Sequence, residues 1–330
     1  MLWVWISLSV MLVVVACDFI YRRYVTPRIT DIFENVPPFN IFSESDNPDA
    51  ERLLISGADG TMLKGSLING HRTDARGLVL FLPELRGNHW MAKRYCEALI
   101  EQGYVVMAVD FRSQGESAEM PGYTPIHWIT EYEMADVDSM LQFIDSRPLL
   151  HRLPLLACGV SRGGVAALVA ACRYPRIRGV VADSAFGTMS MSKYFVDRFV
   201  SHVIPDWVYP LLPDWHVNLT LRQAMLLSEK RRNCRYVHLE LERDTLDSNS
   251  VLLISGGRDS YVTPEIAERL QSIIGRQCQL WIVPAAKHNM SRSVSTEEYD
   301  RRVLNHFAAC LGTTSQTLII RRENELADAA

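Results

Sequence analysis

Residues 155–164 read LLACGVSRGG, and this stretch decides the fold. Its apolar first half predicts a buried strand, and the alanine-rich segment 166–171 predicts a helix. Between them, Gly159, Ser161 and Gly163 form a sharp Gly-x-Ser-x-Gly turn, in which a Cβ at either glycine would meet the neighbouring strand or helix. The turn sets the serine hydroxyl at a helix N-terminus, where developing negative charge is favoured. We therefore predict that Ser161 is a nucleophile; the alternative is a structural turn.

Strands and helices alternate on both sides of this stretch. Apolar runs at 77–82, 104–109 and 179–182 predict strands that are buried on both faces, as in parallel sheets. After an irregular segment, further strands are expected at 251–255 and 279–283, separated by a helix. This pattern predicts an α/β fold with a doubly wound, mostly parallel sheet and helices on both faces. Polar residues that follow the strands are then expected to gather at one edge of the sheet.

The chain divides by composition into an anchor, a linker, a large domain and a tail. Residues 1–24 form the expected anchor, and the proline-containing segment 25–50 is expected to be a linker. The α/β domain is expected over 51–312. Within it, prolines and tryptophans interrupt the alternation at about 184–250, which predicts a small helical cap over the sheet edge. Residues 313–330 are expected to be a flexible tail.

The N-terminus predicts one transmembrane helix. Residues 2–21 are apolar apart from two serines and one aspartate, which is about the length that crosses a bilayer. No Lys or Arg precedes this run, whereas Arg22, Arg23 and Arg28 follow it. By the positive-inside rule, the α/β domain then remains on the cytoplasmic side of the membrane. The alternative is a bacterial lipoprotein anchored at Cys17, and the missing basic residues before the run argue against it.

Charge and cysteine content exclude several classes of partner. The formal net charge of −4 gives no reason to expect a nucleic-acid partner. The seven cysteines are scattered singly, in neither a disulfide framework nor a metal-ligand spacing.

Two further residues complete a candidate catalytic triad. Asp259 and His288 each follow a predicted strand, and the chain order Ser161, Asp259, His288 is typical of one class of hydrolytic site. The imidazole would take the serine proton, and the carboxylate would fix the imidazole tautomer. Asp183 also follows a strand and is the alternative acid. Among the other histidines, His89 could line the site.

Several short motifs carry a resemblance to a known superfamily. Besides the Ser161 turn, they are residues 59–65, 110–117, 183–186, 257–259 and His288. With these motifs the chain resembles the α/β-hydrolase superfamily over about residues 51–311. It is most similar there to the membrane-anchored Bem46-like and serine-aminopeptidase-like (Hydrolase_4) group. The resemblance implies a serine hydrolase of esters, thioesters or amides that needs no metal or cofactor.

The chain departs from this family in one functional loop. The family usually has a His-Gly-x-x-Gly sequence there, whereas residues 83–87 read PELRG. The backbone amides of Leu85 and Arg162 are expected to donate to the oxyanion, and one such donor contributes about 3–4 kcal/mol. We hypothesise that Glu84 pairs with Arg162 and supports this loop, with Arg86 as the other possible partner. The alternative is that Glu84 points into solvent.

Three functions remain open from the sequence. The first is a membrane-tethered serine hydrolase that acts through an acyl-enzyme on an acyl ester, a lipid or an acylated protein. The second is a catalytically silent α/β-hydrolase-fold protein that binds a partner or lipid at the membrane, and the altered loop is its motive. The third is an acyltransferase that uses the same triad.

Overall fold

A computed structural model describes residues 2–36, 44–205 and 207–312 of the 330-residue chain. The chain forms two compact units, which are described separately below. Unit 1 comprises Met1–Val36 and Met191–Cys234, and unit 2 comprises Pro37–Ser190 and Arg235–Ala330. The segment 191–234 therefore belongs with the N-terminal helix, although residues 37–190 separate the two in sequence.

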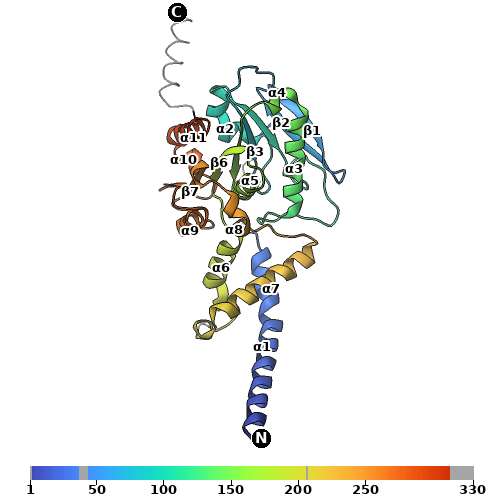
Figure 1. Cartoon of the computed structure of the whole chain (residues 1–330), viewed down its shortest axis with the longest axis vertical. Helices are drawn as coiled ribbons and strands as arrows, with labels where there is room; N and C mark the ends of the chain where they lie inside the picture. Colours follow the sequence, from blue (N-terminus) through green and yellow to red (C-terminus); the bar gives the residue numbers. More distant parts are fainter. Residues whose placement is uncertain (1, 37–43, 206, 313–330) are drawn as a thin grey trace, which may run out of the picture. The chain divides into compact units, whose positions relative to one another are not determined.

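Unit 2 is built on an eight-stranded sheet with the order β1-β2-β4-β3-β5-β6-β7-β8 (Figure 1). The β1–β2 and β2–β4 pairs are antiparallel, and all the other pairs are parallel. Right-handed crossovers between parallel strands bring their carboxyl ends to one edge of the sheet. The strands are β1 Glu51–Ser56, β2 Met62–Ile68, β3 Leu78–Leu82, β4 Val105–Val109, β5 Leu155–Val160, β6 Ile177–Asp183, β7 Val251–Gly256 and β8 Gln279–Val283.

Helices cover both faces of this sheet. Alternate residues of β5 point to opposite faces, so Leu156 and Cys158 pack on one side with α2 and α11. On the other side, α5 packs against α3 as well as against β3 and β5. The helices of unit 2 are α2 Met91–Glu101, α3 Glu131–Ser146, α4 Pro148–His151, α5 Arg162–Arg173, α8 Leu239–Glu242, α9 Pro264–Ile274, α10 Ser291–Val294 and α11 Thr296–Cys310. Two 3₁₀ turns, Arg243–Thr245 and Ser248–Ser250, lead into β7.

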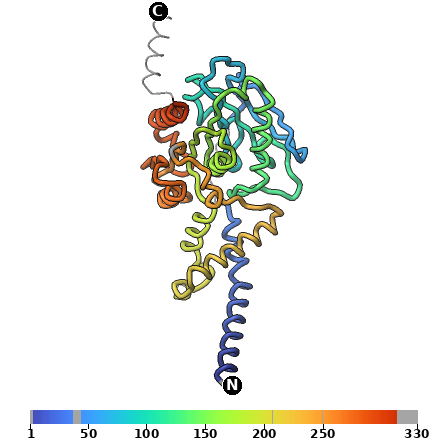
Figure 2. Tube along the Cα trace, in the orientation of Figure 1, coloured from blue at the N-terminus to red at the C-terminus, as the bar shows by residue number. Residues whose placement is uncertain are grey.

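Unit 1 consists of α1 packed against the helices of the 191–234 segment. Its elements are α1 Leu2–Glu34, the greater part of α6 Thr188–Phe199, the 3₁₀ turns Val200–His202 and Tyr209–Leu211, and α7 Asp214–Arg232. The second half of α1 lies alongside α7 (Figure 2). Val25, Ile29 and Phe33 are buried there at a spacing of four residues, on one side of α1. The Thr30 hydroxyl also donates to the Ala224 carbonyl at 3.1 Å.

Two boundary predictions were wrong. A linker was expected from residue 25, but α1 continues without a break to Glu34 and has Pro27 in its interior. An interior proline costs a helix about 3 kcal/mol, and burial of the side chains that face α7 offsets that cost. The expected cap, 184–250, is too long, because residues 235–250 belong to unit 2, where Tyr236 forms a bridge with Thr130. The location of the cap over the sheet edge stays a prediction.

Two local sequence signals also shape unit 2. The Asp-Gly turn joins β1 to β2, and Thr130 with Glu133 forms a complete capping box on α3. The expected tail, 313–330, and residues 37–43 of the expected linker lie outside the described residues.

Candidate active site

Ser161 lies in a strained turn between β5 and α5. Its φ is 51°, in the left-handed region that non-glycine residues rarely adopt, at a cost of about 1–3 kcal/mol. A Cβ on Gly163 would collide with the Leu82 carbonyl, and one on Gly159 would collide with the carbonyl of Gly163. Both glycines are therefore required by the close approach of backbone, as the sequence predicted. The turn places Ser161 directly before the N-terminus of α5.

The structure brings Ser161, His288 and Asp259 together in one hydrogen-bonded chain. Ser161 Oγ lies 3.0 Å from His288 Nε2, and His288 Nδ1 lies 2.6 Å from Asp259 Oδ2. The other carboxylate oxygen of Asp259 accepts from the backbone amides of Tyr261 and Val262, at 2.8 and 2.9 Å. These two bonds fix the carboxylate toward the imidazole. The arrangement can remove a proton from the serine hydroxyl and deliver it elsewhere.

Asp183, the alternative acid, has different partners. It ends β6 and is fully buried, and its Oδ1 accepts from the hydroxyls of Ser184 and Ser291 at 3.0 and 3.1 Å. Burial raises the pKa of this carboxyl to about 6, although the two hydroxyls and His288 oppose the rise. The His288 ring is hydrogen-bonded to Asp259 instead, so the geometry favours Asp259 as the triad acid.

The 83–87 loop is held by a residue that the sequence reasoning missed. The Gln114 side-chain amide donates to the Glu84 carbonyl at 2.7 Å and to the Gly87 carbonyl at 3.1 Å. The Gly87 amide also donates to the Glu84 carbonyl, which closes a tight turn around Leu85. Gln114 lies in the 110–117 motif, so the motif itself was the signal, although its amide was not singled out.

The predicted Glu84–Arg162 ion pair is wrong. Arg162 Nη2 instead lies 2.6 Å from Glu133 Oε1, and Glu84 Oε2 accepts from the Asn289 side chain. Glu84 is only 3% exposed, so the solvent-facing alternative is wrong as well. Arg86, the other suggested partner, is exposed at a φ of 64°. The reason is directional, because the Arg162 side chain extends toward the start of α3, where Glu133 completes the helix cap.

Arg162 lies at the centre of a buried polar network. Its guanidinium donates to the Trp128 carbonyl at 3.3 Å, to Gln114 Oε1 at 3.5 Å and to the Tyr123 hydroxyl at 3.4 Å. Burial alone would lower the pKa of this guanidinium, but the neighbouring Glu133 carboxyl more than compensates and the pKa is raised. The network links the residue after Ser161 to the 83–87 loop through Gln114. The backbone N–H of Arg162 is one of the first four in α5, which have no carbonyl acceptor within the helix.

One aromatic ring packs against the imidazole and has further rings behind it. The Tyr261 ring meets His288 edge-on, with ring centroids 5.2 Å apart, and it also contacts Phe186 and His127. His89 does not take part in this contact group, because its Nδ1 lies 2.9 Å from Asp110 Oδ2, with both side chains buried. His89 therefore orders the start of the 110–117 motif.

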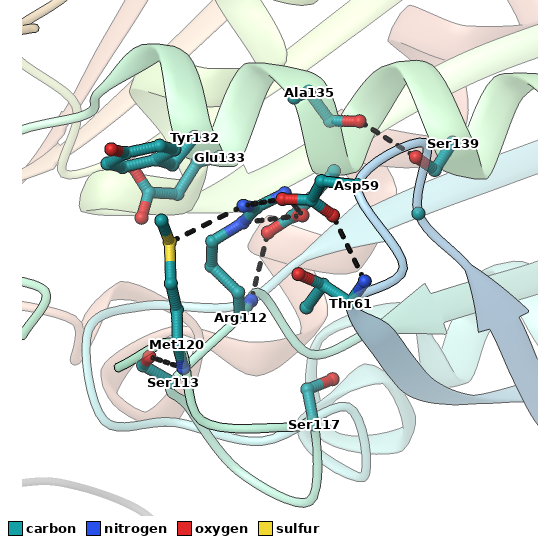
Figure 3. Close-up of polar contacts among 12 residues, drawn as sticks. Asp59, Thr61, Arg112, Ser113, Ser117, Met120, Tyr132, Glu133, Ala135 and Ser139 are labelled. Atoms are coloured by element: carbon teal, nitrogen blue, oxygen red, sulfur yellow. Dashed lines mark hydrogen bonds and ion pairs between the residues drawn. The ribbon is translucent and has the colours of Figure 1, made fainter. Parts of the chain in front are cut away.

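A buried arginine organises the rest of that motif. Figure 3 shows the Arg112 guanidinium beside Asp59, with further contacts below α3. Arg112 Nη1 lies 2.6 Å from Asp59 Oδ2, and Nη2 lies 2.6 Å from Asp136 Oδ1. Burial raises the pKa of Asp136 to about 6, whereas hydrogen bonds from Thr61, with Arg112 nearby, lower that of Asp59 to about 2. The group fixes the loop that carries Gln114.

Within the described parts of the chain, no three His, Cys, Asp or Glu side chains cluster in a way that could hold a metal ion.

Comparison with known proteins agrees with this architecture. The family model for serine aminopeptidase, S33 (Hydrolase_4) matches residues 73–246, a range that includes Ser161 and ends before Asp259 and His288. No curated relative matches the chain.

Solved structures share the fold at low sequence identity. An esterase of Pyrococcus furiosus, Pf2001, is 19% identical with a TM-score of 0.58, over 84% of this chain and 97% of that one. A hydrolase from Pseudomonas aeruginosa PA01 is 18% identical with a TM-score of 0.53, over 79% and 99%. A thioesterase domain from the curacin biosynthetic pathway is 14% identical with a TM-score of 0.52, over 77% and 99%. The predicted α/β-hydrolase fold is thus confirmed, and the chain belongs to the serine aminopeptidase S33 (Hydrolase_4) family.

Proposed function

We propose that this protein is a serine hydrolase of carboxylic esters, thioesters or amides. The observation that carries the proposal is the continuous hydrogen-bonded chain from Ser161 Oγ through His288 to Asp259. A serine hydroxyl becomes a useful nucleophile when an oriented imidazole accepts its proton. Family membership supports hydrolytic activity in general, and the triad supports a serine nucleophile in particular.

The reaction follows from the positions of these groups. Ser161 Oγ attacks the acyl carbon while its proton moves to His288 Nε2, and the backbone amides of Leu85 and Arg162 bind the resulting oxyanion. The intermediate then expels the alcohol, thiol or amine, which takes the proton from His288 and leaves an acyl-serine. A water molecule, deprotonated by the same nitrogen, attacks the acyl-serine, and its breakdown releases the acid and restores Ser161. Asp259 keeps the imidazole in the required tautomer throughout.

We also propose that α1 anchors the enzyme in a membrane. Among the described residues, one helix is long and apolar enough to cross a bilayer, and none of its most apolar window is buried. Residues 3–16 are all exposed, which would be costly in water for so many apolar side chains. The arginines that follow this segment favour a cytoplasmic location for the remainder of the chain. An anchored enzyme has ready access to acyl esters, lipids and acylated proteins in that membrane.

The nucleophile is tested by labelling the full chain in detergent with a fluorophosphonate probe. We expect labelling of the wild type and of Ser146→Ala, which alters an exposed serine of α3, but not of Ser161→Ala. A folded wild type that does not react would favour the silent binding protein over the hydrolase.

The anchor is tested by alkaline carbonate extraction of membranes that contain the full chain. A spanning helix keeps the protein in the pellet, and Cys17→Ala then changes neither its retention nor its mass. Release of the Cys17→Ala variant into the supernatant, with loss of a lipid mass, would instead indicate a lipoprotein.

A further inference from the structure

Unit 1 exposes a second group of apolar side chains besides the apolar segment of α1. This group is distant from that segment in sequence but belongs to the same unit. Trp207, Leu211, Trp215 and Leu219 are 72%, 71%, 64% and 40% exposed. They lie in the turn before α7 and in its first two turns, where Trp215 and Leu219 share one helix face. We call these four residues the interfacial patch. Large apolar groups concentrated on a short exposed segment mark a binding surface.

The contacts between α7 and α1 give the level of this patch along α1. His216 Nε2 lies 2.7 Å from Asp18 Oδ1, near the start of α7, whereas Ser228 Oγ donates to Glu34 Oε1 at 2.6 Å near its end. Both helices therefore advance toward the same end of unit 1, although α7 crosses α1 obliquely (Figure 2). Trp215 precedes His216, so Trp215 lies close to the level of Asp18. Tyr209, between Trp207 and Leu211, lines a small cavity with Tyr21, so that turn lies within about one helical turn of the same level.

Asp18 marks the boundary of the uncharged part of α1. No charged residue occurs between Leu2 and Cys17, and Asp18 is the first one in the chain. Its carboxylate is paired with Arg22 Nε at 2.7 Å as well as with His216. A boundary between an apolar helix segment and a neutralised carboxylate is where a bilayer surface would lie if α1 spans it. The exposed Tyr24 and the basic residues Arg22 and Arg23 follow at the same end.

We propose that the interfacial patch inserts into the headgroup region of the bilayer that α1 spans, so that unit 1 binds the membrane at two places. Tryptophan is enriched at this depth because its ring is apolar and its N–H remains hydrated. A helix that lies at the interface buries one apolar face to a shallow depth. The occupant is lipid rather than a protein partner, because Trp215 and the Tyr209 turn lie near Asp18 and Tyr21, where the exposed apolar segment of α1 ends. This inference rests on the membrane anchor proposed above.

The test is quenching of tryptophan fluorescence by brominated phosphatidylcholine, with the full chain in vesicles of that lipid. Replacement of Trp207 and Trp215 by phenylalanine is expected to lower the quenched amplitude by about half, since Trp3 and Trp5 in α1 remain. Bromine near the headgroup should quench the patch more than bromine near the chain end. Trp281→Phe, in β8 of unit 2, is the matched control and should leave the quenched amplitude unchanged.

The outcomes separate the patch from the anchor. If the double variant Trp3→Phe with Trp5→Phe leaves the quenching unchanged, the proposal that α1 spans the bilayer is wrong. If those two residues account for all the quenching, the anchor stands and the patch proposal is overturned. Acrylamide in the water phase then identifies the true environment, because it reaches an exposed patch but not one covered by a second copy or another protein.

Discussion

The Arg162 guanidinium lies 2.6 Å from Glu133 Oε1, and both side chains are completely buried. Arg162 is the residue after the proposed nucleophile, and Glu133 belongs to the first turn of α3, so the pair fastens the turn at Ser161 to a separate helix. A buried ion pair is weak evidence of net stabilisation, but removal of one partner leaves an uncompensated charge.

Breaking this pair should strongly destabilise the protein. We expect Arg162→Met to lower the free energy of unfolding by about 3–5 kcal/mol, because the buried Glu133 carboxyl loses its cation. The double variant Arg162→Met with Glu133→Leu should recover much of this loss. Urea unfolding of the full chain in detergent micelles measures both. The matched control is Arg173→Met, whose side chain is 27% exposed and pairs with Glu131 and Glu242; an equal loss there would contradict the special role of Arg162.

Loss of the Gln114 amide should slow acyl transfer without weakening substrate binding. Gln114→Ala removes both donors to the 83–87 loop, so the Leu85 amide is no longer held where the oxyanion forms. We expect kcat for an acyl ester to fall about 100-fold with little change in KM. Gln271→Ala removes a comparable bond, from Nε2 to the Cys278 carbonyl at 2.7 Å, at the amino end of β8, whereas the triad residues follow the carboxyl ends of their strands. Equal kinetic effects of the two variants would show that the Gln114 contact is only structural.

The Glu84–Asn289 contact should position the loop that carries His288. Asn289 follows His288 at a φ of 58°, so glycine is tolerated there by the backbone. Asn289→Gly removes the donor to the buried Glu84 carboxyl, and we expect a loss of about 1–3 kcal/mol in stability together with slower fluorophosphonate labelling. Asn233→Gly makes the same change at a φ of 48° after α7 and should leave the labelling rate unaltered. Normal labelling of Asn289→Gly would exclude a positioning role.

The buried Asp183 carboxyl should make stability depend on pH. Its pKa in the folded protein is about 6, raised by burial, and in the unfolded chain it is about 3.9. Between these values the folded state binds more protons than the unfolded state, so stability falls as pH rises and the loss is complete above about pH 7. Asp183→Asn does not titrate. The stability of the wild type relative to this variant should therefore fall by about 2 kcal/mol between about pH 4 and pH 7. Parallel stability curves from urea titrations would contradict this assignment.

The fold could be predicted from local patterns because the parallel strands are short apolar runs and the turn at Ser161 has a strict steric requirement. That Ser161, Asp259 and His288 lie together could be predicted because each follows a strand and those strand ends meet at one edge of the sheet. The partner of Arg162 could not be predicted in this way. Gln114 bonds both to Arg162 and to the Glu84 carbonyl, and the choice between Glu84 and Glu133 depends on the direction of a long side chain.

The end of α1 and the extent of the cap were missed for a related reason. Pro27 is a valid local signal for a helix end, but contacts with α7, nearly two hundred residues away, outweigh it. Sequence periodicity describes one segment at a time and contains no information about which distant helix it will meet. The bond between Thr30 and Ala224 is an example of such a distant contact.

Because α1 continues into unit 1, only a cut at certain positions would leave the contacts of unit 1 intact. Cleavage near residue 25 would remove Tyr21 and Arg22, which contact His216 and Gln223, and cleavage after Glu34 would leave Val217 and Leu221 of α7 exposed. If α1 is the anchor proposed above, a protease that releases unit 1 intact must cut before Asp18, close to the proposed lipid surface. A water-soluble form for crystallisation should begin at the same place, with the helical stub retained as part of the folded protein.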